Sequence, residues 1–286
     1  MTQDALPLII VIDIDGTMIG DISPQISSYD IFNAIKSKGG HLSQKANDVS
    51  NKLKCGILRP YFAEFVQRVS VSIPRVEFFV YTASEHKWAL NIVKHIEKAC
   101  HVKFNKPIFT RKECVLQRGE YMKAVKFINK SIFRTLKKKF NLSNITDIND
   151  SILIIDNRSD IYSDNDLKHH VQCSTYNYKY PENIPALFDA TEYVKHYDVV
   201  APIISRFYDF QPPQDFMAFQ ERFYSLYTKL ILSARQGNAQ YVKDVFFKRL
   251  YKLIIHLFVT KKYAKFDPAV VRFINRHLGT ETSTPR

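Results

Sequence analysis

The sequence predicts an α/β fold with a doubly wound parallel β-sheet, a small insertion over the ligand site and an all-helical C-terminal extension. Three apolar runs have the length of a strand and end in polar residues: Leu8 to Thr17, Val76 to Thr82 and Ser151 to Asn157. Helical patterns lie between these runs. Strands that alternate with helices form a parallel sheet with helices on both faces, and ligands collect outside the carboxyl ends of its strands.

The first run, from Leu8 to Ile12, is continuous and rich in β-branched residues, as expected of a strand that is buried on both faces. Acidic and turn residues follow it at once. Apolar residues at helical spacing predict three helices, over Tyr61 to Val69, His86 to Lys98 and Tyr121 to Phe140. The three polar strand ends should therefore meet at one edge of the sheet.

A polar segment rich in Ser and Lys, from Gly20 to Lys54, interrupts the alternation, and a short helix is expected around Asp30 to Lys36. We interpret this segment as an insertion over the site, covering about residues 19–56 of a first domain that spans residues 1–198. Residues 199–286 would form a second, basic helical module.

This C-terminal module holds two long helical patterns, Gln214 to Gln236 and Ala239 to Tyr263, separated by Gly237 and Asn238. Asp267 and Pro268 have the pattern of an N-cap and a first-turn proline, so that a short helix should end before Gly279. An apolar stripe in the middle helix either packs in the core, which is the favoured alternative, or forms a groove for a partner. It consists of Val242, Phe246, Leu250, Leu253 and Leu257.

Charge is the unusual bulk property of this chain. It has 41 Lys and Arg residues against 28 Asp and Glu residues, a net charge of +13. From Val199 onward, fourteen basic and six acidic residues leave a net charge of +8. Such a surface attracts nucleic acid, a phosphorylated or acidic protein, or an anionic membrane, and the alternative is a charge that only keeps the chain soluble.

The longest apolar stretch is about eight residues, against roughly 20 for a transmembrane helix, and there is no signal-peptide pattern. We therefore expect an intracellular protein, nuclear or cytoplasmic, whose many Lys, Asn, Ile and Tyr residues fit an AT-rich genome such as that of a large DNA virus. No pattern indicates an oligomeric state. The four cysteines lack the spacing of a zinc site or a disulfide framework and should be reduced; they are Cys55, Cys100, Cys114 and Cys173.

Asp13 and Asp15 follow the first strand with one residue between them, so both carboxylates can lean to the same side. An isolated Asp-x-Asp is usually a surface pair, but this one stands between an apolar strand and a Gly-Thr turn. A carboxylate held ready by Mg²⁺ can attack a phosphate, and a second carboxyl group can protonate the leaving oxygen. We assign the nucleophile to Asp13 and acid/base catalysis to Asp15, whose backbone carbonyl can also bind the metal.

This opening resembles the Asp-x-Asp-x-Thr motif of the haloacid dehalogenase superfamily of aspartyl-phosphate phosphatases. Thr82, Lys123 and Asp156-Asn157 match its second, third and fourth motifs in order. Between about Leu8 and Tyr180 the chain further resembles the RNA polymerase II C-terminal-domain phosphatases, the small phosphatases and NLI-interacting-factor-like proteins. The motifs that carry this resemblance are Leu58-Arg59-Pro60, Tyr81-Thr82-Ala83-Ser84, Arg111-x-Glu113-Cys114-Val115 and Arg118-Gly119-x-Tyr121-x-Lys123.

The resemblance implies a role for each matching residue. Thr82 would donate a hydroxyl hydrogen bond to the phosphate, and Lys123 would supply a fixed positive charge. Arg111 would bind the substrate. Trp88 stands where the family has a tyrosine that faces the substrate peptide, with an ordinary helix position as its alternative. The implied Mg²⁺ site consists of Asp13, Asp15, Asn157 as a direct ligand, and Asp156 as a ligand or as a group behind the ligands.

The leading hypothesis is a Mg²⁺-dependent protein serine/threonine phosphatase that works through an aspartyl-phosphate, on a phosphorylated protein such as the repeats of RNA polymerase II. Two departures from the family keep other hypotheses open, because Gly16-Thr17-Met18 replaces Glu-Thr-Leu and Arg158-Ser159 replaces Ser-Pro. The Asp-Gly-Thr form and the basic C-terminal third also suit a polynucleotide 3′-phosphatase or a nucleotidase. A catalytically weak adaptor is the third hypothesis, which the presence of both Asp13 and Asp15 disfavours.

Overall fold

A four-stranded sheet of order β2-β1-β5-β6 lies at the centre of the computed structural model. The structure describes residues 6–40, 49–180, 195–208 and 216–279. β1 (Leu8–Ile12) pairs in parallel with β2 (Val76–Val80) and β5 (Ile152–Asp156), and β5 pairs in parallel with β6 (His170–Gln172). This topology confirms the predicted α/β fold. Strand β6 was not predicted, because three residues are too few to give a pattern.

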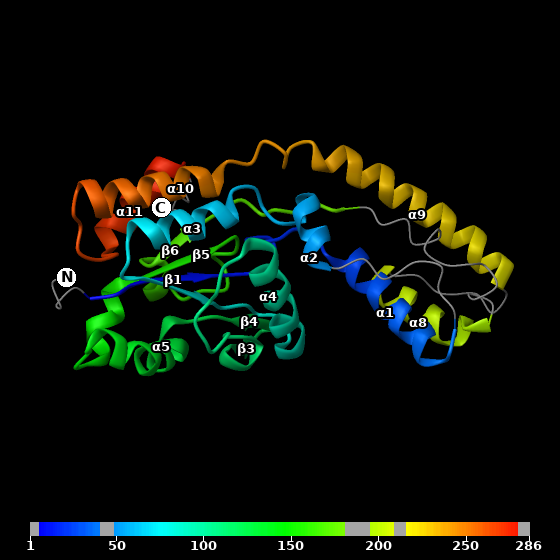
Figure 1. The fold of residues 1–286 in the computed structure, drawn as a ribbon, viewed down its shortest axis with the longest axis horizontal. Helices are drawn as coiled ribbons and strands as arrows, with labels where there is room; N and C mark the ends of the chain where they lie inside the picture. The colour runs from blue at the N-terminus through cyan, green and yellow to red at the C-terminus, as the bar shows by residue number, and fades with distance from the viewer. Residues whose placement is uncertain (1–5, 41–48, 181–194, 209–215, 280–286) are drawn as a thin grey trace. The chain divides into compact units, whose positions relative to one another are not determined.

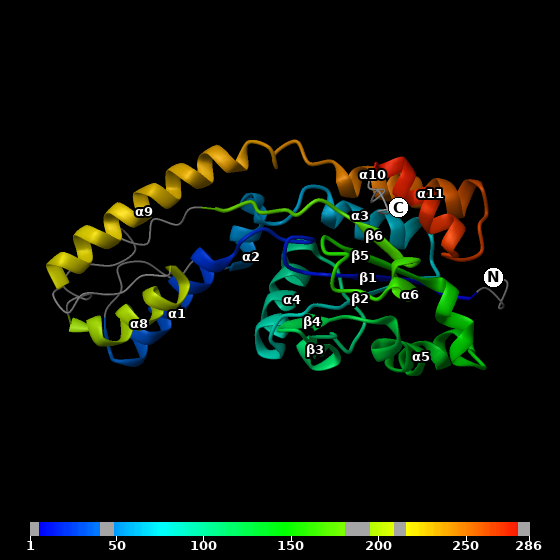
Figure 2. The ribbon, with the colours of Figure 1, turned by 180° about the vertical axis from the view of Figure 1, so that it is seen from behind.

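One face of the sheet is covered by α5 (Val125–Phe140), as Figures 1 and 2 show. Ile128, Ile132 and Leu136 of this helix are buried at helical spacing and share a core cluster with residues of β1, β2 and β5. The sequence pattern predicted that this helix begins at Tyr121, but it begins at Val125. The reason is a β-hairpin, in which β3 (Val115–Gln117) pairs with β4 (Glu120–Met122).

The other face carries α3 (Phe62–Ser72), α10 (Phe246–Ile255) and α11 (Pro268–Leu278) (Figure 1). The ring of Phe65 in α3 lies 5.8 Å from that of Phe78 in β2 and 5.1 Å from that of Phe247 in α10, measured between centroids. The sheet is therefore sandwiched between apolar helix faces, as expected for a doubly wound fold.

One more helix and several short elements belong to the part of the chain between the strands. α4 (His86–Cys100) follows β2 and buries Ala89, Ile92, Val93 and Ile96, the residues of its predicted stripe. The remaining short elements are α2 (Val49–Lys52), α6 (Asp164–Leu167), 3-10 turns at Arg111–Glu113 and Ile145–Ser151, and a π-helical turn at His256–Thr260. The chain is kinked within Leu53–Ile57, where Cys55 and Gly56 are not helical.

Contacts divide the chain into two units. The first, which we call the sheet unit, comprises Met1–Ile19, Leu58–Tyr176 and Asp244–Arg286. The second, the helical unit, comprises Gly20–Ile57 and Asn177–Lys243. The domain boundary expected between residues 198 and 199 stays a prediction, as does a position of the insertion over the site.

In the helical unit, α1 (Ser23–Ser37) packs against α8 (Tyr197–Tyr208), and Arg206 forms an ion pair of 2.6 Å with Asp30. α1 is longer than the predicted helix over Asp30 to Lys36. α9 (Phe216–Asn238) continues through Gly237, where the sequence had predicted a break. Part of the first long C-terminal pattern, residues 214 and 215, lies outside the described residues.

The second long pattern was predicted to be helical from Ala239, but α10 begins only at Phe246. Val242, which precedes the helix, is therefore 72% exposed, whereas Leu250 and Leu257 are buried within the sheet unit. Phe246 and Leu253 are half-buried, so only part of the predicted stripe packs in the core, and the buried face of α10 also includes Phe247 and Ile254. The predicted N-cap is confirmed, since the Asp267 carboxylate accepts from the backbone N–H groups of Ala269 and Val270.

Arg59 connects α10 to the rest of the sheet unit. Its side chain is fully buried, and its guanidinium donates two hydrogen bonds, of 2.8 and 3.1 Å, to one Asp244 oxygen and a third, of 3.1 Å, to Ser174. The same guanidinium lies 4.8 Å from the centre of the Phe246 ring. Arg59, which belongs to the Leu58-Arg59-Pro60 motif, thus fixes the start of the C-terminal helices.

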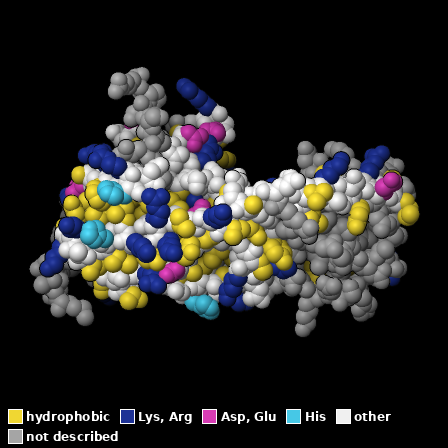
Figure 3. Space-filling model, turned by 90° about the horizontal axis from the view of Figure 1, so that it is seen from above, with side chains coloured by type: hydrophobic (Ala, Val, Ile, Leu, Met, Phe, Trp, Pro, Cys, Tyr) yellow, Lys and Arg dark blue, Asp and Glu magenta, His cyan; other side chains and the backbone are white. Residues whose placement is uncertain are grey.

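Basic side chains on the α10 and α11 side of the sheet unit are interspersed with hydrophobic ones and do not form one block (Figure 3). Among the described residues, no helix has both the length and the hydropathy that crossing a bilayer requires.

Candidate active site

Lys123 joins the ends of the two central strands. Its ammonium group donates hydrogen bonds to Asp13 at 2.6 Å, to Asp156 at 2.7 Å and to the backbone carbonyl of Tyr81 at 2.9 Å. Asp13 follows β1 and Asp156 ends β5, so the parallel pairing of these strands brings the two carboxylates to the same edge. The sequence predicted all three residues as site residues, and the structure brings them into direct contact.

These three charges are buried, and each changes the ionisation of its neighbours. Burial and the nearby Asp156 raise the pKa of Asp13 to about 8, against the opposing effect of Lys123. Burial lowers the pKa of Lys123, but its ion pairs with Asp13 and Asp156 outweigh burial and raise that pKa above its ordinary value. The ammonium therefore stays charged, and an added positive charge would favour the ionised form of Asp13.

Asp156 accepts hydrogen bonds at both of its carboxylate oxygens. Oδ2 accepts from the Tyr162 hydroxyl at 2.8 Å as well as from Lys123, and Oδ1 accepts from the backbone N–H of Arg158 at 2.9 Å. Burial, followed by the charge of Asp156, raises the pKa of Tyr162, which keeps this hydroxyl a donor. Tyr162 was missed in the sequence, where a single tyrosine six residues after Asp156 carries no signal.

The second aspartate of the motif is in a different environment. Asp15 is exposed, and its carboxylate accepts a hydrogen bond of 2.7 Å from the Ser84 hydroxyl. The Ser84 backbone N–H in turn donates to the hydroxyl oxygen of Thr82 at 3.1 Å. The loop after β2 therefore orients both Thr82 and Asp15, and Ser84 is a site residue that the sequence indicated only as part of a motif.

Asn157 is held by the turn that follows Asp15. Its side-chain oxygen accepts from the Thr17 hydroxyl at 3.2 Å, its backbone N–H donates to the same hydroxyl at 3.0 Å, and its amide nitrogen donates to Thr175 at 3.0 Å. Gly16 has φ +73°, and a Cβ atom there would lie 2.9 Å from the Asn157 amide nitrogen. A larger residue at position 16 would therefore both strain the turn and displace Asn157.

The donor atoms in this region fit a hard cation. Among the described residues, no group of three or more His, Cys, Asp or Glu side chains could hold a metal ion. A site built from the Asp13 carboxylate, the Asp15 backbone carbonyl and the Asn157 side-chain oxygen is nevertheless of the kind that Mg²⁺ uses, because Mg²⁺ takes one or two carboxylates and keeps several waters. Asp156 is better placed behind such a site, since protein donors already use both of its oxygens.

Two further residues, Arg111 and Trp88, were predicted to bind the substrate. Arg111 is exposed; its Nε donates to the Ala83 carbonyl at 2.9 Å and its guanidinium lies 4.5 Å from the centre of the Tyr121 ring. Trp88 lies half-buried in the first turn of α4, and in the described part of the chain no hydrogen bond joins it to a predicted site residue. Arg111 thus contacts the loop that carries Ser84, and Trp88 follows that loop in the sequence, at the start of α4.

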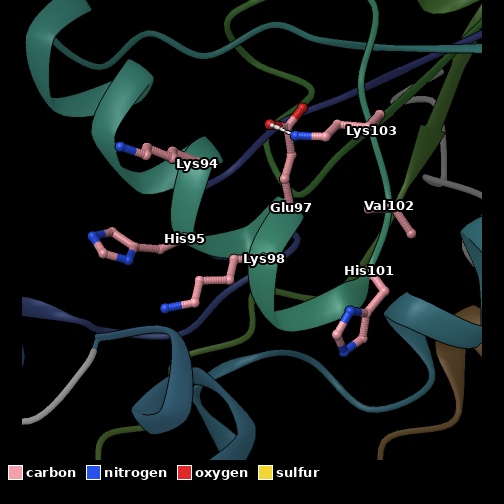
Figure 4. Close-up of a pocket in the computed structure, with 7 residues that line it drawn as sticks. All are labelled: Lys94, His95, Glu97, Lys98, His101, Val102 and Lys103. Atoms are coloured by element: carbon pink, nitrogen blue, oxygen red, sulfur yellow. Dashed lines mark ion pairs between the residues drawn. The ribbon is translucent and has the colours of Figure 1, made fainter.

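A cavity of about 650 Å³ lies at the opposite end of α4, away from these residues. Its lining is basic, with Lys94, His95 and Lys98 projecting from the helix, and Glu97 turned toward Lys103 (Figure 4). No predicted site residue lines it. The candidate active site is therefore the strand edge around Lys123 and not this cavity.

Comparison with known proteins identifies the family of this chain. Residues 8–202 match the family model of the NLI interacting factor-like phosphatases. Two solved structures are similar over 95% of this chain and 70% of theirs, each at 13% identity and a TM-score of 0.35: Fcp1, an essential RNA polymerase II CTD phosphatase, and a fission yeast Fcp1 variant bound to beryllium fluoride. These values are too low to support a function. No curated protein matches the chain.

Proposed function

Because the chain belongs to the NLI interacting factor-like phosphatase family, we propose that it hydrolyses phosphoserine and phosphothreonine in proteins through an aspartyl-phosphate at Asp13. The observation that carries this proposal is the buried contact of Lys123 with Asp13 and Asp156 at the carboxyl ends of β1 and β5. A nucleophile fixed beside a permanent cation is what phosphoryl transfer requires.

In the first step, an Asp13 carboxylate oxygen forms a bond to phosphorus, and the bond from phosphorus to the serine or threonine oxygen breaks. Asp15 gives its proton to the departing oxygen. Lys123 stabilises the negative charge that develops on the phosphoryl oxygens, and the Thr82 hydroxyl is a further donor to them. Since Asp156 is itself fixed by Tyr162, it holds Lys123 in place throughout.

In the second step, Asp15 takes a proton from water, and the water oxygen attacks the phosphorus of the aspartyl-phosphate. The acyl oxygen of Asp13 departs as a carboxylate, and inorganic phosphate is released. The hydrogen bond from Ser84 orients Asp15 for both transfers, and the exposure of Asp15 gives the water access.

Mg²⁺ is the proposed cofactor, held by Asp13, the Asp15 carbonyl and Asn157. When bound, it supplies positive charge that keeps the Asp13 carboxyl ionised and offsets the charge of the incoming phosphate. The turn through Gly16 and Thr17 positions Asn157 for this role.

The phosphoprotein substrate is proposed from the family membership and from Arg111, whose exposed guanidinium lies next to the loop of Ser84. RNA polymerase II is the substrate named for the two Fcp1 structures, and a nuclear or cytoplasmic phosphoprotein of this type is the proposed target here. Binding of a peptide side chain by Trp88 stays a prediction.

An assay with three substrates tests the proposal: a phosphoserine repeat peptide, a 3′-phosphorylated oligonucleotide and a small aryl phosphate, each with Mg²⁺ and with EDTA. We expect Mg²⁺-dependent release of phosphate from the peptide and the aryl phosphate, with a higher kcat/KM for the peptide. The Asp13→Asn variant should lose both activities and keep its fold by circular dichroism.

Preference for the oligonucleotide would replace the proposal by the polynucleotide 3′-phosphatase alternative. Binding of the phosphopeptide without turnover of any of the three substrates would favour the adaptor alternative. Full activity in EDTA would contradict the role given to Mg²⁺.

A further inference from the structure

Helix α5 has six Lys and Arg residues and no Asp or Glu among its 16 residues. At about 100° per residue, five of the six lie within an arc of about 120° opposite the buried residues Ile128, Ile132 and Leu136. We call these five residues the α5 stripe: Lys126, Lys130, Arg134, Lys137 and Lys138. All five are exposed, and in Figures 1 and 2 α5 forms the outer layer on its side of the sheet unit.

The charge of the stripe is not neutralised by the described part of the chain, in which no ion pair joins any of the five to a carboxylate. Two of the five lie near aromatic rings: Lys126 is 5.2 Å from the centre of the Phe127 ring, and Lys137 is 5.7 Å from the centre of the Phe133 ring. Glu77 of β2, which reaches this helix, is paired with Lys139, the sixth cation of α5.

Helix stability does not explain this arrangement. Like charges four residues apart destabilise a helix, and the stripe has three such pairs: Lys126 with Lys130, Lys130 with Arg134, and Arg134 with Lys138. Lys126 also stands in the first turn, where a positive charge opposes the helix dipole. Only Lys137 and Lys138, in the last turn, interact favourably with that dipole. A stripe that costs helix stability indicates a binding surface.

We propose that the α5 stripe binds the phosphate backbone of double-stranded nucleic acid, independently of sequence. Four of the five cations, Lys126, Lys130, Arg134 and Lys138, follow one another about every 6 Å over about 18 Å of helix, and Lys137 adds a charge beside Lys138. A regular series of charges suits a polymer with a phosphate at every nucleotide, whereas an acidic peptide has charges only where its sequence places them.

A duplex fits this surface better than a single strand. Proteins that bind single strands stack the bases on aromatic side chains. On α5 the rings of Phe127, Phe133 and Phe140 are half-buried against the core cluster and lie close to Lys side chains, so they do not form a stacking platform. A duplex keeps its bases stacked inside and presents phosphates to the helix.

Duplex binding by the α5 stripe is a function separate from the proposed phosphatase activity, and the two can be measured independently. α5 begins two residues after Lys123, so the stripe belongs to the same unit as the candidate active site. Binding along α5 would hold the enzyme on nucleic acid and thereby close to phosphoproteins bound there.

Fluorescence anisotropy with a labelled 20-base-pair DNA duplex of arbitrary sequence, in a salt titration, tests the proposal. The full chain should bind with a Kd of about 10 µM or tighter at low salt, and affinity should fall steeply as salt rises. The variant Lys126→Gln/Lys130→Gln/Arg134→Gln/Lys138→Gln should bind at least tenfold more weakly. The slope of log K against log salt should become shallower by about 3 to 4, since each lost duplex contact removes about 0.9.

A matched control removes the same net charge elsewhere in the sheet unit: Lys252→Gln/Lys261→Gln/Lys262→Gln/Arg272→Gln, all at exposed positions. The control should change the slope by less than about 1, and the smaller variant Lys130→Gln/Arg134→Gln should change it by about 2. Thermal unfolding checks that each variant is folded, and hydrolysis of an aryl phosphate should be unchanged in all of them.

Three results would overturn the proposal. The first is no duplex binding by the unmodified chain at low salt. The second is an equal loss in the control variant, because net charge would then account for the binding. The third is tighter, stripe-dependent binding of a multiply phosphorylated peptide, which would make α5 a surface for phosphoproteins.

Discussion

At the scale of single residues, the site depends on one cation shared by two buried carboxylates. Lys123 would be costly to bury alone, but Asp13 and Asp156 each take one of its hydrogen bonds and Tyr81 takes a third. Asp156 is fixed in turn by Tyr162 and by the Arg158 N–H. Among the described residues, no such second donor fixes the Asp13 carboxylate, which suits its proposed role as the nucleophile.

Substitution of Asp15 should reduce activity to a degree that depends on the leaving group of the substrate. Asp15→Asn removes the proton donor but keeps the shape, so hydrolysis of phosphoserine, a poor leaving group, should fall about 10²- to 10⁴-fold. An aryl phosphate, whose departing oxygen needs less protonation, should lose much less in the first step. Measuring kcat/KM for both substrates checks this, and equal losses would contradict the role of Asp15.

Asp13 should also affect stability in a pH-dependent manner. The pKa of Asp13 is about 8 in the folded, metal-free protein, whereas 3.8 is the ordinary value of an aspartate in an unfolded chain. Folding therefore favours the protonated form of Asp13. The cost of burying Asp13 therefore grows as pH rises from about 4 to about 8. In EDTA, Asp13→Asn should stabilise the protein by about 1–3 kcal/mol more at pH 8 than at pH 5.

Denaturant unfolding at the two pH values measures this difference. The matched control is Asp15→Asn, because Asp15 is exposed and its loss should change stability by no more than about 0.5 kcal/mol at either pH. If Asp13→Asn were equally stabilising at both pH values, the raised pKa of Asp13 would be wrong.

At the scale of elements, the attachment of α10 depends on a buried ion pair. Asp244 accepts two hydrogen bonds from Arg59, and the remaining Arg59 nitrogen, Nη1, finds no hydrogen-bond partner in the described part of the chain. Asp244→Ala would leave the buried guanidinium without its counter-charge and should cost about 3–5 kcal/mol. The control Lys265→Ala removes the exposed pair with Asp150 and should cost far less, because solvent screens that pair.

Chemical denaturation of both variants tests this difference. Similar small losses in the two would show that Arg59 does not hold the C-terminal helices.

Long periodic elements and the motif residues could be predicted from the sequence. β1 and α4 have unambiguous patterns. Because the strands are parallel, Asp13 and Asp156 were expected at the same edge of the sheet, and the pairing of β1 with β5 makes them neighbours. Contacts that depend on tertiary structure could not be predicted. Tyr162 and Ser84 have no periodic signature, and the start of α10 depends on the pairing of Asp244 with a residue 185 positions earlier.

At the scale of the whole molecule, the chain returns to the sheet unit after the helical unit. Asn177–Lys243 belongs to the helical unit, but the segment that follows it, Asp244–Arg286, belongs to the sheet unit. The C-terminal helices thus complete a core that begins with Leu8. A basic C-terminal surface that recruits nucleic acid or an acidic protein stays a prediction beside this structural role.

A chain ending at Lys243 should therefore aggregate or unfold early, because α3 would lose the cover of Phe247 and Leu250, which are fully buried. A chain ending at Gly279 keeps both helices and serves as the control. Solubility and melting temperature are the measurements. A soluble, cooperatively folded chain without Asp244–Arg286 would contradict this role of the C-terminal helices.

The central claim, that Asp13 carries the phosphoryl group, is tested most directly by trapping it. A phosphorylated substrate is mixed with the enzyme and Mg²⁺ and quenched with borohydride, which reduces an acyl phosphate to an alcohol, and the peptide containing residue 13 is examined by mass spectrometry. We expect reduction at Asp13 that depends on the substrate, and none at Asp15. A turning-over enzyme in which Asp13 is never modified, or in which another residue is modified instead, would contradict it.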